Sequence, residues 1–123
     1  MTPIFDHLGF NVADFDKSRA FYAQALAPLG ISALFGDAKW SMFGRDGVGA
    51  FWFGETGPVP GPIHLAFHAK TRAEVDAFYA AAIAAGGRDN GGPGLRDYRP
   101  NYYAAFVFDP DGHNIEAVCH AAE

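Results

Sequence analysis

Two histidines begin two similar short segments of this chain, 57 positions apart. His7 begins the segment HLGF, and His64 begins the segment HLAF. Side chains alternate between the two faces of a strand, so each histidine is predicted to point away from the apolar face formed by the leucine and phenylalanine of its segment. Imidazole nitrogens are ligands for divalent transition metals. A pseudo-twofold arrangement of the two segments would bring both imidazoles into one cleft.

Glu116 is the third candidate for this site. In the segment HNIEAVC, Ile115, Ala117 and Cys119 form an apolar face, so Glu116 points the other way. Two imidazoles and one carboxylate with open coordination positions form a facial triad for a divalent metal, and zinc bound by His, His, Glu and a water is equally allowed. The structural alternative is that the histidines are hydrogen-bonded packing residues and the glutamate is solvated.

The similarity around the two histidines extends into an internal repeat. Residues 7–30 and 64–87 align without a gap and share ten identities in 24 positions, including a Phe-Tyr pair and a glycine. Repeats of this kind indicate that one supersecondary unit occurs twice. We therefore expect a single domain over residues 1–123, with modules at about 1–57 and 62–123 and the Gly/Pro-rich segment 54–62 between them.

Each module is predicted to begin with a strand and a helix. The first strand covers about 4–12, and its helix begins near Asp14 or Asp16 as N-cap. In the second module, Thr71 and Glu74 have the spacing of a capping box. Further strands are expected at 31–35, 38–43, 47–53, 102–108 and 113–119. The order βαβββ, twice, predicts an α+β fold with curved mixed sheets around a cleft.

Composition narrows the range of functions. The net charge is −5 without a Lys/Arg cluster, which argues against a nucleic-acid surface. No apolar run is long enough for a membrane helix, and the N-terminal residues lack the pattern of a signal peptide. Cys119 is the only cysteine, so an intramolecular disulfide is impossible and a cytoplasmic location is expected. The expected partners are small molecules or another protein chain.

The paired βαβββ pattern, HLGF…FYAQALAPLG, the second HLAF and DPDGHNIEAV resemble the vicinal oxygen chelate superfamily over nearly the whole chain. This superfamily contains glyoxalase I, bleomycin-resistance proteins, fosfomycin-resistance enzymes, methylmalonyl-CoA epimerase and extradiol dioxygenases. The resemblance implies a glyoxalase-like fold. It also implies that His7, His64 and Glu116 are metal ligands, and that a divalent ion (Zn, Ni, Mn, Co or Fe) chelates two neighbouring substrate oxygens. Short family members commonly pair, so a homodimer is expected.

One position departs from the family pattern. Glyoxalase I usually adds a fourth ligand, a glutamate in the last strand of the first module, where this chain has Ala50 or Trp52. The resemblance therefore favours a three-ligand lyase, isomerase, transferase or dioxygenase acting on a small oxygen-rich substrate. The alternative is a metal-free protein of the bleomycin-resistance type that sequesters an aromatic or drug-like molecule. No general base is evident, so the catalytic residues stay unassigned.

Five residues are candidates for contact with the substrate. Trp52 is expected on the cleft wall. The segment GLRDYRPNYY, residues 94–103, could form a lid in which an arginine meets a substrate carboxylate or phosphate, although an ordinary exposed loop explains it as well. His68 lies roughly 13 Å along the strand from His64, too far for both to bind one ion directly. The candidates are Trp52, His68, Tyr98, Arg99 and Tyr103.

Overall fold

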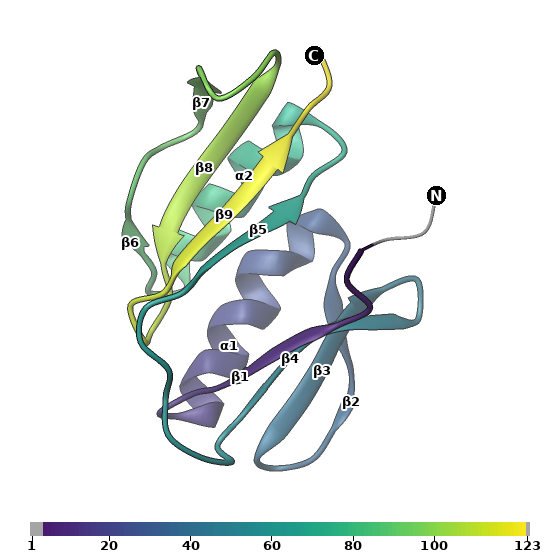
Figure 1. Cartoon of the computed structure of the whole chain (residues 1–123), viewed down its shortest axis with the longest axis vertical. Helices are drawn as coiled ribbons and strands as arrows, with labels where there is room; N and C mark the ends of the chain where they lie inside the picture. The colour runs from purple at the N-terminus through teal and green to yellow at the C-terminus, as the bar shows by residue number, and fades with distance from the viewer. Residues whose placement is uncertain (1–3, 123) are drawn as a thin grey trace.

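The computed structural model describes residues 4–122, which fold into two sheets and two helices (Figure 1). Sheet A contains β1 (Leu8–Asn11), β2 (Ser32–Gly36), β3 (Trp40–Arg45) and β4 (Val48–Gly54) in the order β1-β4-β3-β2. Sheet B contains β5 (His64–His68), β6 (Arg88–Asp89), β7 (Gly94–Arg96), β8 (Tyr102–Phe108) and β9 (Asn114–Cys119). Its order is β5-β9-β8-β6, with β7 also paired to β8. In both sheets the first strand runs parallel to the last one, which confirms the expected α+β class.

The helix of the first module, α1 (Phe15–Leu26), begins at one of the two expected caps. The Asp14 side chain accepts a hydrogen bond from Lys17 N at 3.1 Å, which satisfies one of the free amides at a helix start. A short 3₁₀ helix, η1 (Ala27–Leu29), follows. Gly30 ends it with φ of 76°, a left-handed conformation that glycine adopts without steric cost.

The second helix, α2 (Arg72–Ala84), is capped by the two residues predicted for that role. Thr71 Oγ1 accepts from Glu74 N at 3.1 Å. Glu74 Oε1 reaches back and accepts from Lys70 N at 2.9 Å, one residue before the N-cap. The pair therefore satisfies two backbone donors reciprocally, as in a capping box.

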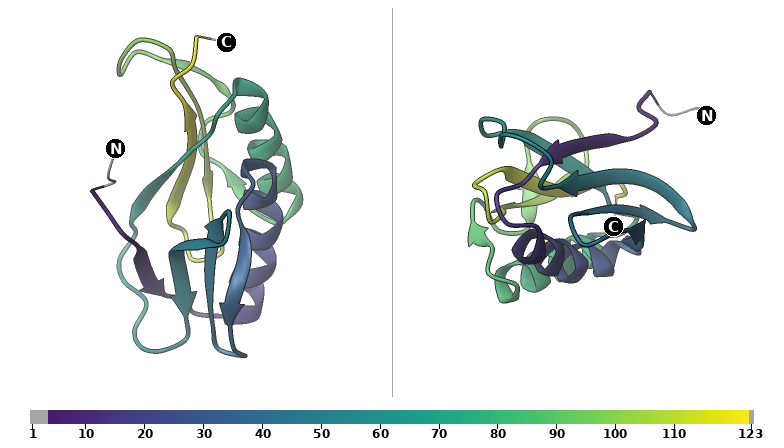
Figure 2. Two further views of the ribbon diagram at one scale, coloured as in Figure 1. Left: turned by 90° about the vertical axis from the view of Figure 1, so that its right-hand side faces the viewer. Right: turned by 90° about the horizontal axis from the view of Figure 1, so that it is seen from below.

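Both helices lie on the same side of the two sheets (Figure 2). Their buried faces and the facing side of both sheets form one apolar core, in which Tyr22, Phe53 and Phe78 are fully buried. The other side of sheet B, here called the outer face, carries a separate small cluster of Ala104, Phe106 and Val118, with Tyr102 packed against it. Because side chains alternate along strands, the same face carries Glu116.

Tight turns connect β3 to β4 and β8 to β9. Asp46 and Gly47, between β3 and β4, have φ of 54° and 78°, the left-handed pair required by a two-residue hairpin. The turn between β8 and β9 is held by Asp109, whose Oδ1 accepts from the backbone nitrogens of Asp111 and His113, each at 2.9 Å. This turn fixes the start of β9, the strand that contains Glu116.

Two sequence-based expectations need correction. The first strand begins at Leu8 instead of residue 4, and Ile4 is 95% exposed because nothing in the described chain packs against it. β6 and β7 were not predicted, since a few residues paired to β8 leave too short a pattern to recognise.

The expected extent of the domain was residues 1–123, and residues 1–3 and 123 lie outside the described part. The division at about residues 57 and 62 stays a prediction. Of the helices formed by residues 4–122, none combines the length and apolar character needed to span a bilayer.

Candidate metal centre

Glu116 is a buried carboxylate on the outer face of sheet B. Only 1% of it is exposed. Its Oε2 accepts a hydrogen bond from the Tyr102 hydroxyl, and its Oε1 lies 2.9 Å from His64 Nε2. Burial and this bond raise the pKa of Tyr102 to about 12, so the phenol stays a donor at neutral pH. A buried carboxylate requires compensating partners, and these two side chains supply them.

The orientation of His64 follows from its other ring nitrogen. Nδ1 lies 3.0 Å from the carbonyl oxygen of Asn114, and a carbonyl can only accept, so Nδ1 carries the proton. In the neutral ring, Nε2 then presents a lone pair to Glu116 Oε1, which is also an acceptor. Two acceptors at 2.9 Å require a proton or a cation between them.

His7 has a similar arrangement on sheet A. It directly precedes β1, and its Nδ1 lies 2.7 Å from Oδ1 of the exposed Asp6 carboxylate. The carboxylate accepts, so the neutral ring of His7 also keeps its lone pair on Nε2. Metal-binding histidines typically donate their second nitrogen to a carboxylate or a carbonyl. Both candidate histidines meet that condition.

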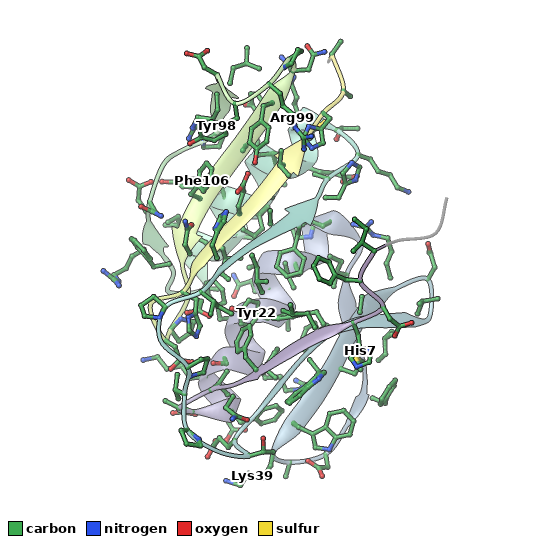
Figure 3. The ribbon with its side chains drawn as sticks, viewed as in Figure 1. His7, Tyr22, Lys39, Tyr98, Arg99 and Phe106 are labelled. Carbon is green, nitrogen blue, oxygen red and sulfur yellow. The ribbon has the colours of Figure 1, made fainter. Side chains whose placement is uncertain are left out.

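The single chain does not assemble the three candidate ligands. His7 and His64 line one cavity of about 510 Å³, which also contacts the apolar residues Phe43, Leu65 and Phe67. Glu116 is not part of the cavity lining. Within residues 4–122, the ligand atoms of His7, His64 and Glu116 do not all come within 4.8 Å of one another. Figure 3 shows His7 beside sheet A, well separated from Phe106, the ring on which His64 stacks in sheet B.

A different group, Asp109, Asp111 and His113, does meet this distance criterion. The hydrogen bonds of these side chains show that they lie close together because they stabilise the turn between β8 and β9. Asp109 Oδ2 accepts from the buried Tyr22 hydroxyl, and Oδ1 accepts the two backbone bonds described above. His113 Nδ1 accepts from Ile63 N at 3.1 Å, so the proton of the neutral ring is on Nε2 and no lone pair is left for a metal.

Three of the five expected substrate contacts lie near one another at one end of the outer face. The His68 ring is 6.0 Å from the ring of His120, and Arg99 Nη2 is 3.2 Å from His120 Nε2. The Tyr98 ring is 5.0 Å from Tyr102. Burial and then the positive charge of Arg99 lower the pKa of His120. This end of the sheet is therefore cationic and aromatic.

The other two expected contacts lie elsewhere. Trp52 covers Gly9 on the face of sheet A away from the helices, where an added Cβ would be 2.0 Å from the indole Cε2. Trp52 does not line the cavity that contains His7 and His64. The Tyr103 hydroxyl donates to Asp76 of α2 at 2.6 Å, which puts Tyr103 on the helix side of sheet B. Alternation along β8 separates Tyr103 from Tyr102.

Sequence reasoning did not identify Tyr102 or His120 as site residues. A signal for Tyr102 existed, because it shares the period-two face of Phe106, which pairs with Glu116 across the hairpin. Recognising it required the register between β8 and β9, which the sequence did not define.

Comparison with known proteins finds one matching family model and several solved structures with a similar fold. The model of the glyoxalase/bleomycin resistance protein/dioxygenase superfamily matches residues 4–117. A glyoxalase/bleomycin resistance protein from Albidiferax ferrireducens T118 has 31% identity and a TM-score of 0.83, over 97% of this chain and 100% of that one. A glyoxalase-related enzyme from Fulvimarina pelagi has 18% identity and a TM-score of 0.73, over 97% and 88% of the two chains. No protein of curated function matches this chain.

A structure with a bound metal also has this fold. A variant of the fosfomycin resistance protein FosX from Listeria monocytogenes, in complex with Mn(II) and a dihydroxypropylphosphonic acid, has 20% identity and a TM-score of 0.71. The match covers 100% of this chain and 94% of FosX. At this identity the likeness shows a shared fold.

Proposed function

This chain belongs to the glyoxalase/bleomycin resistance protein/dioxygenase superfamily, and from that premise we propose that it is a metal-dependent enzyme acting on a small oxygen-rich molecule. The proposed ligands are His7, His64 and Glu116, and the ion is Zn, Ni, Mn, Co or Fe. The reaction is one in which negative charge develops on a substrate oxygen. A reducing cytoplasm suits the single buried cysteine, Cys119.

The observation that carries the proposal is the pairing of His64 Nε2 with Glu116 Oε1 at 2.9 Å. The Asn114 carbonyl holds the proton of His64 on Nδ1, so the lone pair of Nε2 faces a carboxylate oxygen. A divalent cation bound by both atoms removes the repulsion between two acceptors and offsets the cost of burying the carboxylate. A proton between them is the competing occupant.

Each residue has a defined role in this proposal. Tyr102 occupies Oε2 of Glu116 and leaves Oε1 for coordination. Asn114 fixes the ring orientation of His64 through its carbonyl. When bound, the ion supplies a Lewis acid that stabilises negative charge on two neighbouring substrate oxygens. Phe106, stacked on the His64 ring, excludes water from one side of the pair.

We propose that His7 completes the site in a second copy of the chain, in a homodimer. His7 is on an exposed N-terminal segment in which Ile4 and Phe5 are 95% and 74% exposed. Exposed large hydrophobic side chains beside a candidate ligand favour a contact that covers them. In the single chain His7 is too far away to bind one ion together with Glu116 and His64.

The test is metal content per chain, measured by mass spectrometry on untagged protein after reconstitution with each of the five ions. We expect close to one ion per chain in the native protein and a loss of most of it in His64→Ala and Glu116→Gln. His68→Ala is the matched control, because His68 is on the same face of β5 but makes no contact with Glu116. Equal metal content in all four proteins would contradict the assignment.

A second candidate function is favoured by the apolar cavity. Its walls include Phe43, Phe51 and Phe67, and a metal-free binding protein of the bleomycin-resistance type would use such a surface for an aromatic ligand. Failure of every ion to bind would support this function over the enzyme. A screen of aromatic ligands, with and without Phe67→Ala, would then be the decisive measurement.

A further inference from the structure

Arg99 and His120 form a close pair at one end of the outer face of sheet B. Arg99 Nη2 is 3.2 Å from His120 Nε2, and the guanidinium carbon is 5.8 Å from the centre of the Tyr102 ring. A guanidinium can only donate, so His120 accepts through Nε2 and its neutral ring carries the proton on Nδ1. The pair therefore presents an N–H donor on the imidazole and several unused donors on the guanidinium.

The partners of Arg99 differ from those of Arg96, the arginine at the end of β7. Arg96 donates to the carbonyl oxygens of Gly92 and Gly94, at 2.9 and 3.0 Å, which fixes the loop before β8. For Arg99, no carboxylate of residues 4–122 lies within ion-pair distance. A neutral imidazole accepts a hydrogen bond from one of the five guanidinium donors, and it provides no negative charge opposite the positive guanidinium. An anion would satisfy both.

Aromatic rings surround this pair. The Tyr102 and His120 rings are 5.3 Å apart and nearly perpendicular, and the Tyr98 ring is 5.0 Å from Tyr102. The His68 ring lies 6.0 Å from the His120 ring. Arg99 and Tyr98 are exposed, so an anion can reach the guanidinium from solvent.

Tyr102 connects this cluster to the candidate metal centre. Its ring contacts His120 while its hydroxyl donates to Glu116. Glu116 and His120 are four residues apart on the same face, a separation of roughly 13 Å along an extended chain. Between them this face carries the Tyr102 ring and the shorter side chains of Ala104 and Val118. A molecule that reaches both groups therefore lies over these side chains.

We propose that Arg99 and His120 form a subsite for the anionic end, a carboxylate or a phosphate, of a molecule whose other end reaches Glu116 and His64. The assignment of the second end rests on the proposed function, whereas anion binding by Arg99 and His120 does not depend on it. The substrate class is then an acid whose neighbouring oxygens lie up to roughly 13 Å from its anionic group.

The experiment titrates inorganic phosphate, and separately acetate, into metal-free full-length protein at constant ionic strength, with chloride as the reference anion. The readout is the ¹H and ¹⁵N shifts of the His120 side chain, assigned by their absence in His120→Gln. We expect saturable shifts with at least one of the two anions, and the anion that binds more tightly identifies the phosphate or the carboxylate class. Binding is expected to be about tenfold weaker in Arg99→Gln.

Arg88→Gln is the matched control. Arg88 also stacks on an aromatic ring of β8, with its guanidinium carbon 5.0 Å from the centre of the Phe108 ring, but it has no histidine partner. Unchanged affinity in Arg88→Gln and weakened affinity in Arg99→Gln support the proposal. Equal affinity in both variants, or no saturable shift with either anion, overturns it.

A second pair of measurements separates this proposal from the proposed function. Anion binding should persist in Glu116→Gln, and metal binding should persist in Arg99→Gln. Anion binding without any metal binding would support the anion subsite and contradict the proposed metal-dependent enzyme. Loss of anion binding in Glu116→Gln to the same extent as in Arg99→Gln would overturn the subsite as an independent group.

Discussion

Tyr102 donates its phenolic proton to Oε2 of Glu116, which leaves the other carboxylate oxygen facing His64. One side chain on β8 thereby determines which oxygen of a buried acid on β9 is available for a cation. Groups that orient ligands in this way commonly contribute 10–100-fold to metal affinity. Under the proposed function, this relationship assigns Tyr102 the role of a positioning residue rather than a ligand.

Replacing Tyr102 with phenylalanine should therefore weaken metal binding about tenfold or more without removing it. The phenol has a pKa of about 12, so the hydroxyl bond contributes stability below pH 10 that is lost as the pH rises from 10 through 12. Competition with a metal indicator measures the affinity, and absorbance at alkaline pH follows the tyrosinate. Tyr79→Phe is the control, because the Tyr79 hydroxyl donates to the exposed Asp89. Equal metal affinity in both variants would rule out the positioning role.

If His7 binds the ion held by a second copy of the chain, two variants that each lack one ligand should restore metal binding when they are combined. His7→Ala and Glu116→Ala homodimers should each bind metal weakly. After unfolding and refolding together, about half of the chains should be in mixed dimers, in which one of the two sites is complete. Metal content of the mixture should then exceed that of either variant alone. A mixture that binds no more metal than its components would contradict a site shared between two chains.

The group formed by Asp109, Asp111 and His113 should behave as structure and not as a metal site. Asp109→Ala removes the acceptor for the Tyr22 hydroxyl and for two backbone amides in a buried turn. We expect a loss of about 2–4 kcal/mol in the free energy of unfolding, measured with urea. The folded variant should retain its metal at saturating concentrations. Loss of bound metal from folded protein would contradict this interpretation.

His120 should make stability sensitive to mild acid. Burial and the charges of Arg99 and His68 lower its pKa below the ordinary value of 6.5, and Glu116 opposes them. The rings of Tyr98 and Tyr102 face the same cluster. The stability due to neutral His120 is present above pH 6.5 and is lost as the pH falls through the lowered pKa.

The variant His120→Gln should accordingly lose less stability than the native protein between pH 7 and pH 5. Urea unfolding at a series of pH values measures the difference. His68→Gln, which removes a second imidazole from the same cluster, should also reduce the loss by relieving the repulsion on His120. Parallel pH profiles for the native protein and His120→Gln would show that another group controls acid stability.

The sequence determined the local features of this protein. Asp14, Thr71 and Glu74 cap the two helices as their types and spacing indicate, because a cap depends on residues within one turn. The Asp46-Gly47 turn follows from the same short-range physics. The alternation of Ile115, Ala117 and Cys119 was sufficient to turn Glu116 away from the core.

The tertiary structure decided which of these side chains meet. The contact of Tyr102 with Glu116 depends on the register of two antiparallel strands, and a shift of one residue would turn Tyr102 to the helix side. The bond from His64 to the carbonyl of Asn114 depends on the parallel pairing of β5 with β9, 50 residues later in the chain. Arg99 meets His120, 21 residues later in the chain, through the pairing of β8 with β9. Long-range pairing is governed by the packing of the whole core, so no local pattern could reveal it.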